Sequence, residues 1–307
     1  MTHRNVALFN IAVAAACFGT AGAHAAASSP AKPVIFAPGV ISGPANDAAA
    51  TFSPDGRTVY FFRSNGMDYD IMVSHLQGTR WSEPRIASFS GHWRDLEPAM
   101  APNGSYLIFA SSRPIDGGNK PIDGHWGGKP HAGRGGHLWR VDRTKSGWSK
   151  PVLLPDAVNR RDSTFSPAIA SDGSVYFMAA TGRGGHFRLY CSHFKNGKYQ
   201  PARLLPFSAG KWGGVDPAIA PDQSFIVFAS NRPPTPANSA DVFIAFRNSN
   251  GQWGKPIDLG ASVDNPAGVD ELRLGPDGHT LYYTTGYVVP PIYPKSIESS
   301  RHGLMTM

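Results

Sequence analysis

Cysteine is nearly absent from this sequence, which contains only Cys17 and Cys191 among 307 residues. Because Cys17 lies in a segment that we expect to be removed, the mature chain keeps one cysteine and cannot form an intramolecular disulfide. Long apolar runs are also lacking, since no stretch after Ala25 approaches the roughly 20 apolar residues that a membrane-spanning helix needs. We therefore predict a chain without a transmembrane segment, stabilised by its packed core.

Charge is sparse and scattered along the chain. Only 17% of the residues are charged, and 29 Lys and Arg against 22 Asp and Glu give a formal net charge of +7. No block of like charges occurs, so the composition favours anionic partners weakly and gives no argument for nucleic acid. A Gly-x-Ser-x-Gly elbow is also missing, which excludes the nucleophile arrangement of α/β-hydrolases.

The N-terminal segment has the composition of a secretory signal peptide. His3 and Arg4 precede an apolar run over residues 6–18, and Ala23-His24-Ala25 provides a small-residue cleavage motif. We predict a signal peptide over residues 1–25 and a periplasmic or secreted mature protein of residues 26–307. A lipid anchor on Cys17 is the alternative.

Five copies of one pattern occupy the rest of the chain. Each is a short apolar stretch, a turn of the Pro-Asp-Gly kind and an aromatic-rich stretch, as in residues 51–56 followed by 59–62. The turns contain Asp55, Asn103, Asp172, Asp222 and Asp277. Repeats of this length built from β-type segments are typical of a propeller or solenoid, because no single repeat buries its own apolar face.

Each repeat contains four strand-like segments, named A to D in chain order. Strand A precedes the turn, strands B and C are apolar, and strand D follows an aromatic marker residue and a proline, which suits an outer edge strand. The markers are Trp81, Trp148, Tyr199 and Trp253. The fifth repeat lacks a marker, so we expect residues 33–46 to supply its strand D and close the ring.

These patterns predict an all-β fold, a closed β-propeller of four-stranded blades. The five strand A segments indicate five blades, and six is the alternative if residues 111–140 contain a degenerate blade. We predict a single propeller domain over residues 26–307, with a glycine-rich insertion loop at 114–136.

The repeats resemble the WD40-like (PD40) repeat family, found in TolB-type propellers and in many exported bacterial proteins. The resemblance rests on the Ser53-Pro54-Asp55-Gly56 turn, on Phe-Ala-Ser-x-Arg-Pro at 109–114 and 228–233, and on the Trp-x-x-Pro markers. It covers nearly all of residues 26–307 and implies a propeller that serves as an interaction platform, a ligand binder or an enzyme domain. The TolB-like N-terminal α/β domain is missing, which argues against TolB's particular role.

Acidic residues recur six positions before the turn residue, where strand A begins near one mouth of the central channel. The five equivalent positions hold Ala49, Glu97, Ser166, Asp216 and Glu271. With their neighbours they give a candidate ligand-binding set at this mouth, namely Glu97, Asp216, Glu271, Asp95, Asp47, Arg94, Arg113 and Arg232. Such a ring could bind a cation, a sugar or a peptide, or it could pair within itself and hold loop amides.

Trp126 completes the candidate set, because a tryptophan in the insertion loop could stack on a sugar or on a partner aromatic residue. The histidines near it, His125, His131 and His137, are expected to lie in a solvated loop and to bind no metal.

We expect an exported binding module for an envelope or extracellular protein or for a glycan, with no transmembrane segment, no nucleic-acid partner, no catalytic residues and no cofactor. A structural divalent cation at the acidic mouth is a further hypothesis. The alternative function is a glycan-cleaving enzyme that uses the carboxylates at the channel mouth, since glycoside hydrolysis requires two of them.

Overall fold

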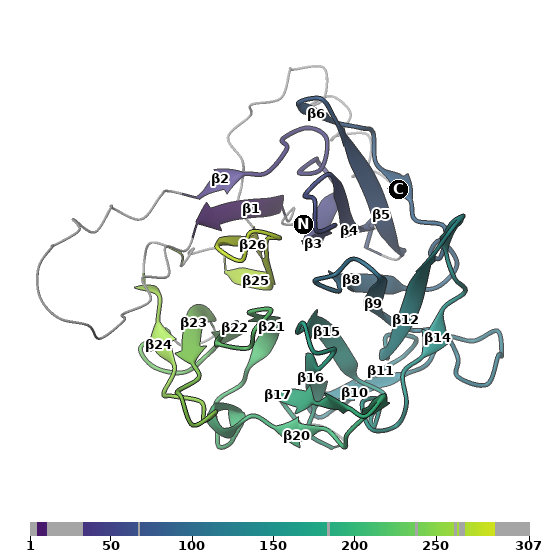
Figure 1. Ribbon diagram of the computed structural model, residues 1–307. Helices are drawn as coiled ribbons and strands as arrows, with labels where there is room; N and C mark the ends of the chain where they lie inside the picture. Colours follow the sequence, from purple (N-terminus) through teal and green to yellow (C-terminus); the bar gives the residue numbers. More distant parts are fainter. Residues whose placement is uncertain are drawn as a thin grey trace, which may run out of the picture.

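The computed structural model describes residues 5–10, 33–66, 68–182, 185–236, 239–260, 263 and 268–285, with the side chains of 5–10 excepted. Strands dominate, and one 3-10 helix, Pro206–Ser208, occurs in these ranges. Figure 1 shows the sheets arranged radially around a central axis, which confirms the predicted all-β propeller. Within the described ranges, no helix is long and apolar enough to span a membrane.

Four blades follow one another along the chain, and each begins with its innermost strand. Antiparallel pairing runs outward from strand A to strand D in each blade. The first blade contains β3 (Asn46–Phe52), β4 (Thr58–Ser64), β5 (Tyr69–Gln77), β6 (Arg80–Trp81) and β7 (Arg85–Ile86), and the second contains β8 (Asp95–Met100), β9 (Tyr106–Ser111), β12 (His137–Thr144), β13 (Gly147–Trp148) and β14 (Val152–Leu153). The third contains β15 (Thr164–Ile169), β16 (Val175–Ala180), β17 (Phe187–Ser192) and β20 (Arg203–Leu204), with the hairpin β18 (Phe194–Lys195) and β19 (Lys198–Tyr199), and the fourth contains β21 (Val215–Ile219), β22 (Phe225–Ser230), β23 (Asp241–Phe246) and β24 (Ile257–Asp258).

A fifth sheet combines strands from the N-terminal and the C-terminal parts of the described chain. Its strand order is β25 (Val269–Leu274), β26 (Thr280–Thr285), β1 (Asn5–Asn10) and β2 (Val34–Ile35). β2 takes the outer position that the sequence analysis gave to residues 33–46. β1 comes from the predicted signal peptide, and the other residues of that segment lie outside the described ranges.

The insertion in the second blade folds into a two-stranded hairpin, β10 (Gly124–Trp126) and β11 (Lys129–His131), rather than into a four-stranded sheet. The apolar core lies between the blades, where strands A to C of neighbouring sheets bury their alternating side chains. Two kinds of surface therefore meet the solvent at the ends of the channel: the A–B turns with the C–D hairpins at one end, and the B–C and D–A connections at the other.

Candidate functional site

The five positions that the sequence analysis singled out share one unusual backbone conformation. Ala49, Glu97, Ser166, Asp216 and Glu271 all have positive φ, between 48° and 56°. Each lies in a β-bulge, because the pairing of strand A with strand B shifts register at that point in all five sheets. A bulge turns the affected residue out of the regular strand alternation and changes the direction of its side chain.

Two of the three ring carboxylates hold the neighbouring sheet. The Oε2 atom of Glu97 accepts a hydrogen bond of 2.6 Å from the backbone N–H of Ser166. In the same way, Oδ2 of Asp216 accepts one of 3.0 Å from the backbone N–H of Glu271. Each carboxylate thus satisfies the amide of the equivalent bulge in the next sheet, and the ring is a joint between blades.

Arg273 provides the cation of this buried cluster. It is 3% exposed, and its guanidinium donates to the carbonyl of Pro98 at 3.4 Å and to Oγ of Ser166 at 3.2 Å. Its Nη2 atom lies 3.8 Å from Oε2 of Glu271. A backbone carbonyl and two side chains, from three sheets, therefore meet on one guanidinium.

The cluster contains more negative than positive groups, and this changes its protonation. Glu97, Asp216 and Glu271 are 3%, 4% and 7% exposed. Burial, followed by repulsion from Asp216, raises the pKa of Glu97 to about 7. Burial, followed by repulsion from Glu97, also raises the pKa of Glu271 well above its ordinary value. Both glutamates thus keep their protons to higher pH than an exposed carboxyl does.

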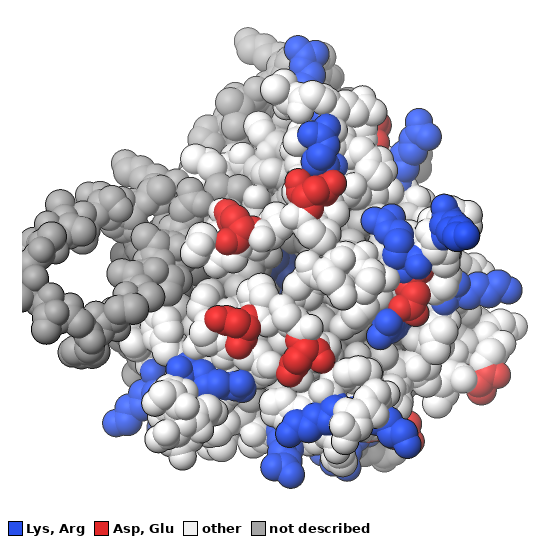
Figure 2. Space-filling view, viewed as in Figure 1, with Lys and Arg blue, Asp and Glu red and all other residues white. Residues whose placement is uncertain are grey.

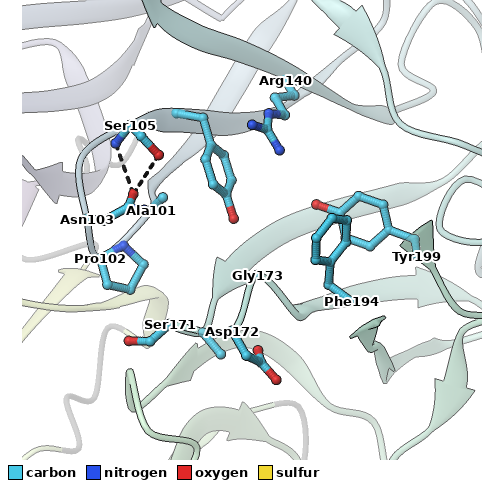
Figure 3. A pocket seen from close by; sticks show the side chains of 12 residues that line it. Ala101, Pro102, Asn103, Ser105, Arg140, Ser171, Asp172, Gly173, Phe194 and Tyr199 are labelled. Atoms are coloured by element: carbon cyan, nitrogen blue, oxygen red, sulfur yellow. Dashed lines mark hydrogen bonds between the residues drawn. The ribbon is translucent and has the colours of Figure 1, made fainter. Parts of the chain in front are cut away.

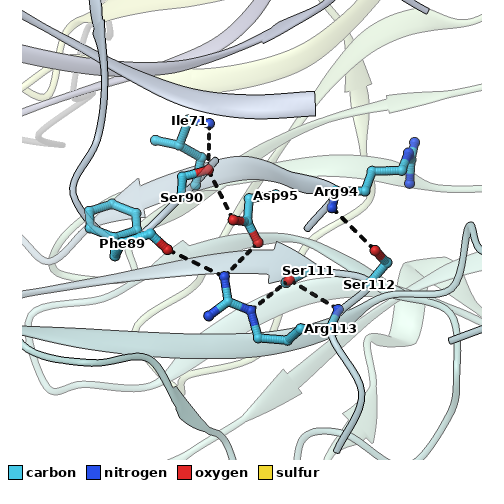
Figure 4. Close-up of polar contacts among 8 residues, drawn as sticks. All are labelled: Ile71, Phe89, Ser90, Arg94, Asp95, Ser111, Ser112 and Arg113. Carbon is cyan, nitrogen blue, oxygen red and sulfur yellow. Dashed lines mark hydrogen bonds and ion pairs between the residues drawn. The ribbon is translucent and has the colours of Figure 1, made fainter. Parts of the chain in front are cut away.

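The remaining acids of the predicted set are paired one by one with arginines. Nη2 of Arg113 donates to Oδ1 of Asp95 at 2.7 Å, and Oγ of Ser90 donates to the other oxygen of Asp95 at 2.9 Å (Figure 4). Asp47 is held by Nε of Arg63 at 2.6 Å. Asp47 and Asp95 are both fully buried, so these pairs fasten the start of strand A in the first and second blades.

The other predicted residues are also occupied within the fold. Arg94 lies over the ring of Tyr69 at 4.0 Å. Arg232 repeats the geometry of Arg113, because its Nε donates to Oγ of Ser230 at 2.9 Å and its Nη2 to the carbonyl of Phe207 at 3.0 Å. Trp126 stacks on His131 with ring centroids 3.7 Å apart. The structure thus brings together Glu97, Asp216 and Glu271 and distributes the rest among separate local contacts.

A cleft at the opposite end of the channel is the more open site. It has a volume of about 450 Å³ and lies between the second and third blades, at the A–B turns. Figure 3 shows Arg140 and Tyr199 on one side of it and the turn residues Pro102 and Asp172 on others. Phe194 lies against Tyr199, with ring centroids 5.0 Å apart, and supplies an apolar surface.

The cleft exists because the second and third blades depart from the repeat. Between the first and second blades, Nε1 of the marker Trp148 donates to the hydroxyl of Tyr60 at 3.0 Å. The register of strand B puts Ile108 at the position equivalent to Tyr60, and the third blade has Tyr199 in place of the marker tryptophan. Ile108 and Tyr199 are smaller than the tyrosine and the tryptophan that they replace. The junction between the second and third blades therefore lacks the indole–tyrosine contact that fills the junction between the first and second blades.

Arg140, a charged residue in a strand, contributes a guanidinium group to the cleft. Arg140 occupies a strand C position that is apolar in the first blade, Val73. Its guanidinium lies 3.8 Å from the ring centre of Tyr106 and is paired with Asp142. Burial raises the pKa of Tyr199, so its hydroxyl remains a hydrogen-bond donor. The cleft therefore offers hydroxyls, aromatic faces, a guanidinium and the carboxylate of Asp172.

The face that carries the A–B turns is acidic near its centre. Exposed aspartates occupy four of the five turns, and Asn103 occupies the other; the aspartates are Asp55, Asp172, Asp222 and Asp277. Figure 2 shows acidic side chains gathered around the centre of the viewed face, over the inner strands, with basic side chains toward the rim. Hydrogen bonds from Ser53 and Ser224 lower the pKa values of Asp55 and Asp222, so these turns stay negatively charged at neutral pH.

The cleft was not predicted from the sequence, although a signal for it exists in the repeat. The signal is departure from the pattern: tyrosine at a tryptophan position and arginine within an apolar strand. A metal centre has less support, because among the described residues no group of three or more His, Cys, Asp or Glu is arranged to hold a metal ion.

No family model and no curated protein matches this chain. Solved structures with related folds include TolB from Acinetobacter baumannii, at 16% identity and a TM-score of 0.43, over 69% of this chain and 43% of that chain. A TolB candidate from Agrobacterium tumefaciens has 14% identity and a TM-score of 0.47, over 94% of this chain and all of that one. An oligogalacturonate lyase in complex with manganese has 18% identity and a TM-score of 0.44, over 76% of this chain and 57% of that chain. TolB-type propellers are thus among its structural neighbours, but at these TM-scores no argument about function rests on them.

Proposed function

We propose that this protein is an exported binding module and that the cleft between the second and third blades binds its ligand, a segment of an envelope or extracellular protein or a glycan. The observation that carries the proposal is the cleft itself, where aromatic faces, hydroxyls, Arg140 and Asp172 surround a concavity of about 450 Å³. Few convergent polar groups in a partly apolar concavity are the usual composition of a ligand site.

The burial and the hydrogen bonds of the ring carboxylates favour a binding role over glycan cleavage. Hydrolysis needs two carboxyl groups that reach the scissile bond. Glu97 and Asp216 are instead buried, and each accepts a hydrogen bond from a backbone amide of the next sheet. Their use as joints between blades leaves the cleft as the site for binding. Asp172 is the one carboxylate among the residues that line the cleft, and it accepts hydrogen bonds from the N–H of Ser174 and from Nε2 of Gln223.

The proposal includes a five-bladed ring that closes at the fifth sheet. Its support is that β25 contacts both β21 of the fourth blade and β3 of the first. Export is proposed from the sequence of residues 1–25, and cleavage after Ala25 would remove β1 from the fifth sheet. Closure through β25 does not depend on β1, so the two proposals are compatible. The mass of the exported protein tests the cleavage site directly.

The binding site is tested by a matched pair of variants. Purified protein is screened on an oligosaccharide array and against a displayed peptide library, and ligands are then titrated against Asp172→Asn and Asp222→Asn. Both aspartates lie in A–B turns and cap their own turns, but only Asp172 lines the cleft. We expect about tenfold weaker binding for Asp172→Asn and for Tyr199→Ala, and unchanged binding for Asp222→Asn. Equal affinities in all variants would remove the cleft as the site, and glycan turnover would favour the enzyme alternative.

A further inference from the structure

A second cavity lies at the other end of the same inner strand. β15 runs from Thr164 to Ile169, with the ligand cleft just beyond its end and this cavity just before its start. The cavity has a volume of about 230 Å³ and is lined by His125, Arg160, Arg161, Asp162, Ala180 and Gly182. The proposed binding function uses none of these residues.

A histidine is fixed in this cavity by a carboxylate. Nδ1 of His125 lies 2.6 Å from Oδ2 of Asp162, and since a carboxylate only accepts, Nδ1 carries the proton. The backbone N–H of His125 also donates to Oγ of Ser163 at 2.9 Å. The hairpin β10–β11 and the start of β15 thus position the imidazole, and its Nε2 atom remains for another partner.

Both oxygens of this carboxylate accept hydrogen bonds. The second oxygen, Oδ1 of Asp162, accepts one of 3.0 Å from Oγ of Ser163. Within the described ranges neither oxygen forms an ion pair with the two arginines beside it. Arg160 and Arg161 are exposed, and within the described ranges their guanidinium groups form no ion pair or hydrogen bond. The lining consequently carries two guanidinium charges against the single carboxylate of Asp162.

We propose that this cavity binds a tetrahedral oxyanion, a phosphate or sulfate group. Guanidinium groups match the oxygens of such anions with paired N–H donors, and they tolerate partial burial better than lysine. Two guanidiniums, and Nε2 of His125 in its imidazolium form, with Nδ1 bonded to Asp162, supply donors from three directions. This arrangement suits an anion with three free oxygens better than a carboxylate with two. A phosphate ester on a sugar, a phospholipid headgroup and free phosphate all present this chemistry.

Calorimetric titration of the full-length protein tests the proposal with four probes: inorganic phosphate, inorganic sulfate, glucose 6-phosphate and vesicles containing phosphatidic acid. We expect saturable binding of phosphate and about tenfold weaker binding in Arg161→Gln, in Arg160→Gln and in His125→Gln. The matched control is Arg203→Gln, which removes an exposed arginine of β20 outside the cavity, and it should bind as the unaltered protein does.

The probes also identify the source of the anion, because tighter binding of glucose 6-phosphate or of vesicles than of free phosphate would indicate an esterified ligand. The thermal midpoints of all variants are measured to show that each is folded. The proposal fails if no probe binds at millimolar concentration, or if folded Arg161→Gln and Arg203→Gln bind phosphate equally. Since the cleft variants and the arginine variants are separate, failure here leaves the proposed function of the cleft untouched.

Discussion

Replacing Glu97 by glutamine should make the protein more stable at alkaline pH than the unaltered chain. Glu97 is 3% exposed and lies in a cluster where three carboxyl groups share one cation, Arg273. An amide of the same shape retains the hydrogen bond from Ser166, because its oxygen still accepts the 2.6 Å bond from that N–H. The substitution thus removes the titration of Glu97 and preserves the joint between the blades.

The sign and size of the effect follow from the pKa of Glu97, which burial and then Asp216 raise from 4.5 to about 7. Between these pH values the folded protein retains a proton that the unfolded chain has released, so the free energy of unfolding falls as pH rises through this window. The difference corresponds to on the order of 3 kcal/mol, all of it lost above about pH 7. Glu271 is coupled to Glu97, so removing one charge also lets the other ionise more easily.

Urea unfolding followed by tryptophan fluorescence between about pH 5 and pH 8 measures this difference. We expect the unaltered protein to lose stability across the window, and Glu97→Gln to show a flatter profile and the higher stability at the alkaline end. Asp222→Asn is the control, because the lowered pKa of this exposed aspartate gives stability that is lost only as pH falls below the window. Parallel profiles for Glu97→Gln and the unaltered protein would refute the reasoning, since Glu97 would then be ionised in the fold.

Two further predictions concern the turns and the paired acids. Gly104 and Gly278 occupy equivalent turns with φ of 71° and 69°, but a Cβ on Gly104 would lie 2.8 Å from Cδ of Pro54, whereas nothing lies within 4 Å of one on Gly278. Both alanine variants should lose about 1 kcal/mol for the backbone, and Gly104→Ala about 1–3 kcal/mol more in urea unfolding; equal losses would contradict the contact. Asp95→Asn should cost about 3–5 kcal/mol by the same assay, because it leaves the Arg113 guanidinium without its buried countercharge; a loss below about 1 kcal/mol would show that water compensates the arginine.

The repeat made the blades predictable, because turn chemistry and strand alternation act locally. The predicted strand B over residues 59–62 lies inside β4, Thr58–Ser64, and the Asp-Gly turn before it forms as expected. The hairpin β10–β11 could not be predicted in the same way. Its glycine-rich sequence indicates a loop, and its position depends on a contact with Ser163, far away in the chain.

The candidate sites were harder to predict than the fold, for two physical reasons. The equivalent positions of Glu97, Asp216 and Glu271 were visible in the repeat, but their burial depends on a bulge and on Arg273. Arg273 follows Glu271 on β25 and reaches across to Pro98 and Ser166 in two other sheets. The cleft depends on the absence of two large side chains at repeat positions. Tyr199 at the marker position predicts an open space only when its neighbour across the junction is also known to be smaller than in the first blade.

The two proposed sites share one junction, and this suggests why the repeat departs from its pattern there. At two of the bulges, the carboxyl groups of Glu97 and Asp216 accept hydrogen bonds from the next sheet, and their substitution should change stability. The junction between the second and third blades, which the Glu97–Ser166 bond crosses, also has the inserted hairpin at one end of β15 and the open cleft at the other. A propeller gains specificity by altering single junctions, because the remaining blades keep the ring together. Substitutions in the cleft and in the cavity beside His125 should therefore change binding more than stability, and those at the bulges should do the reverse.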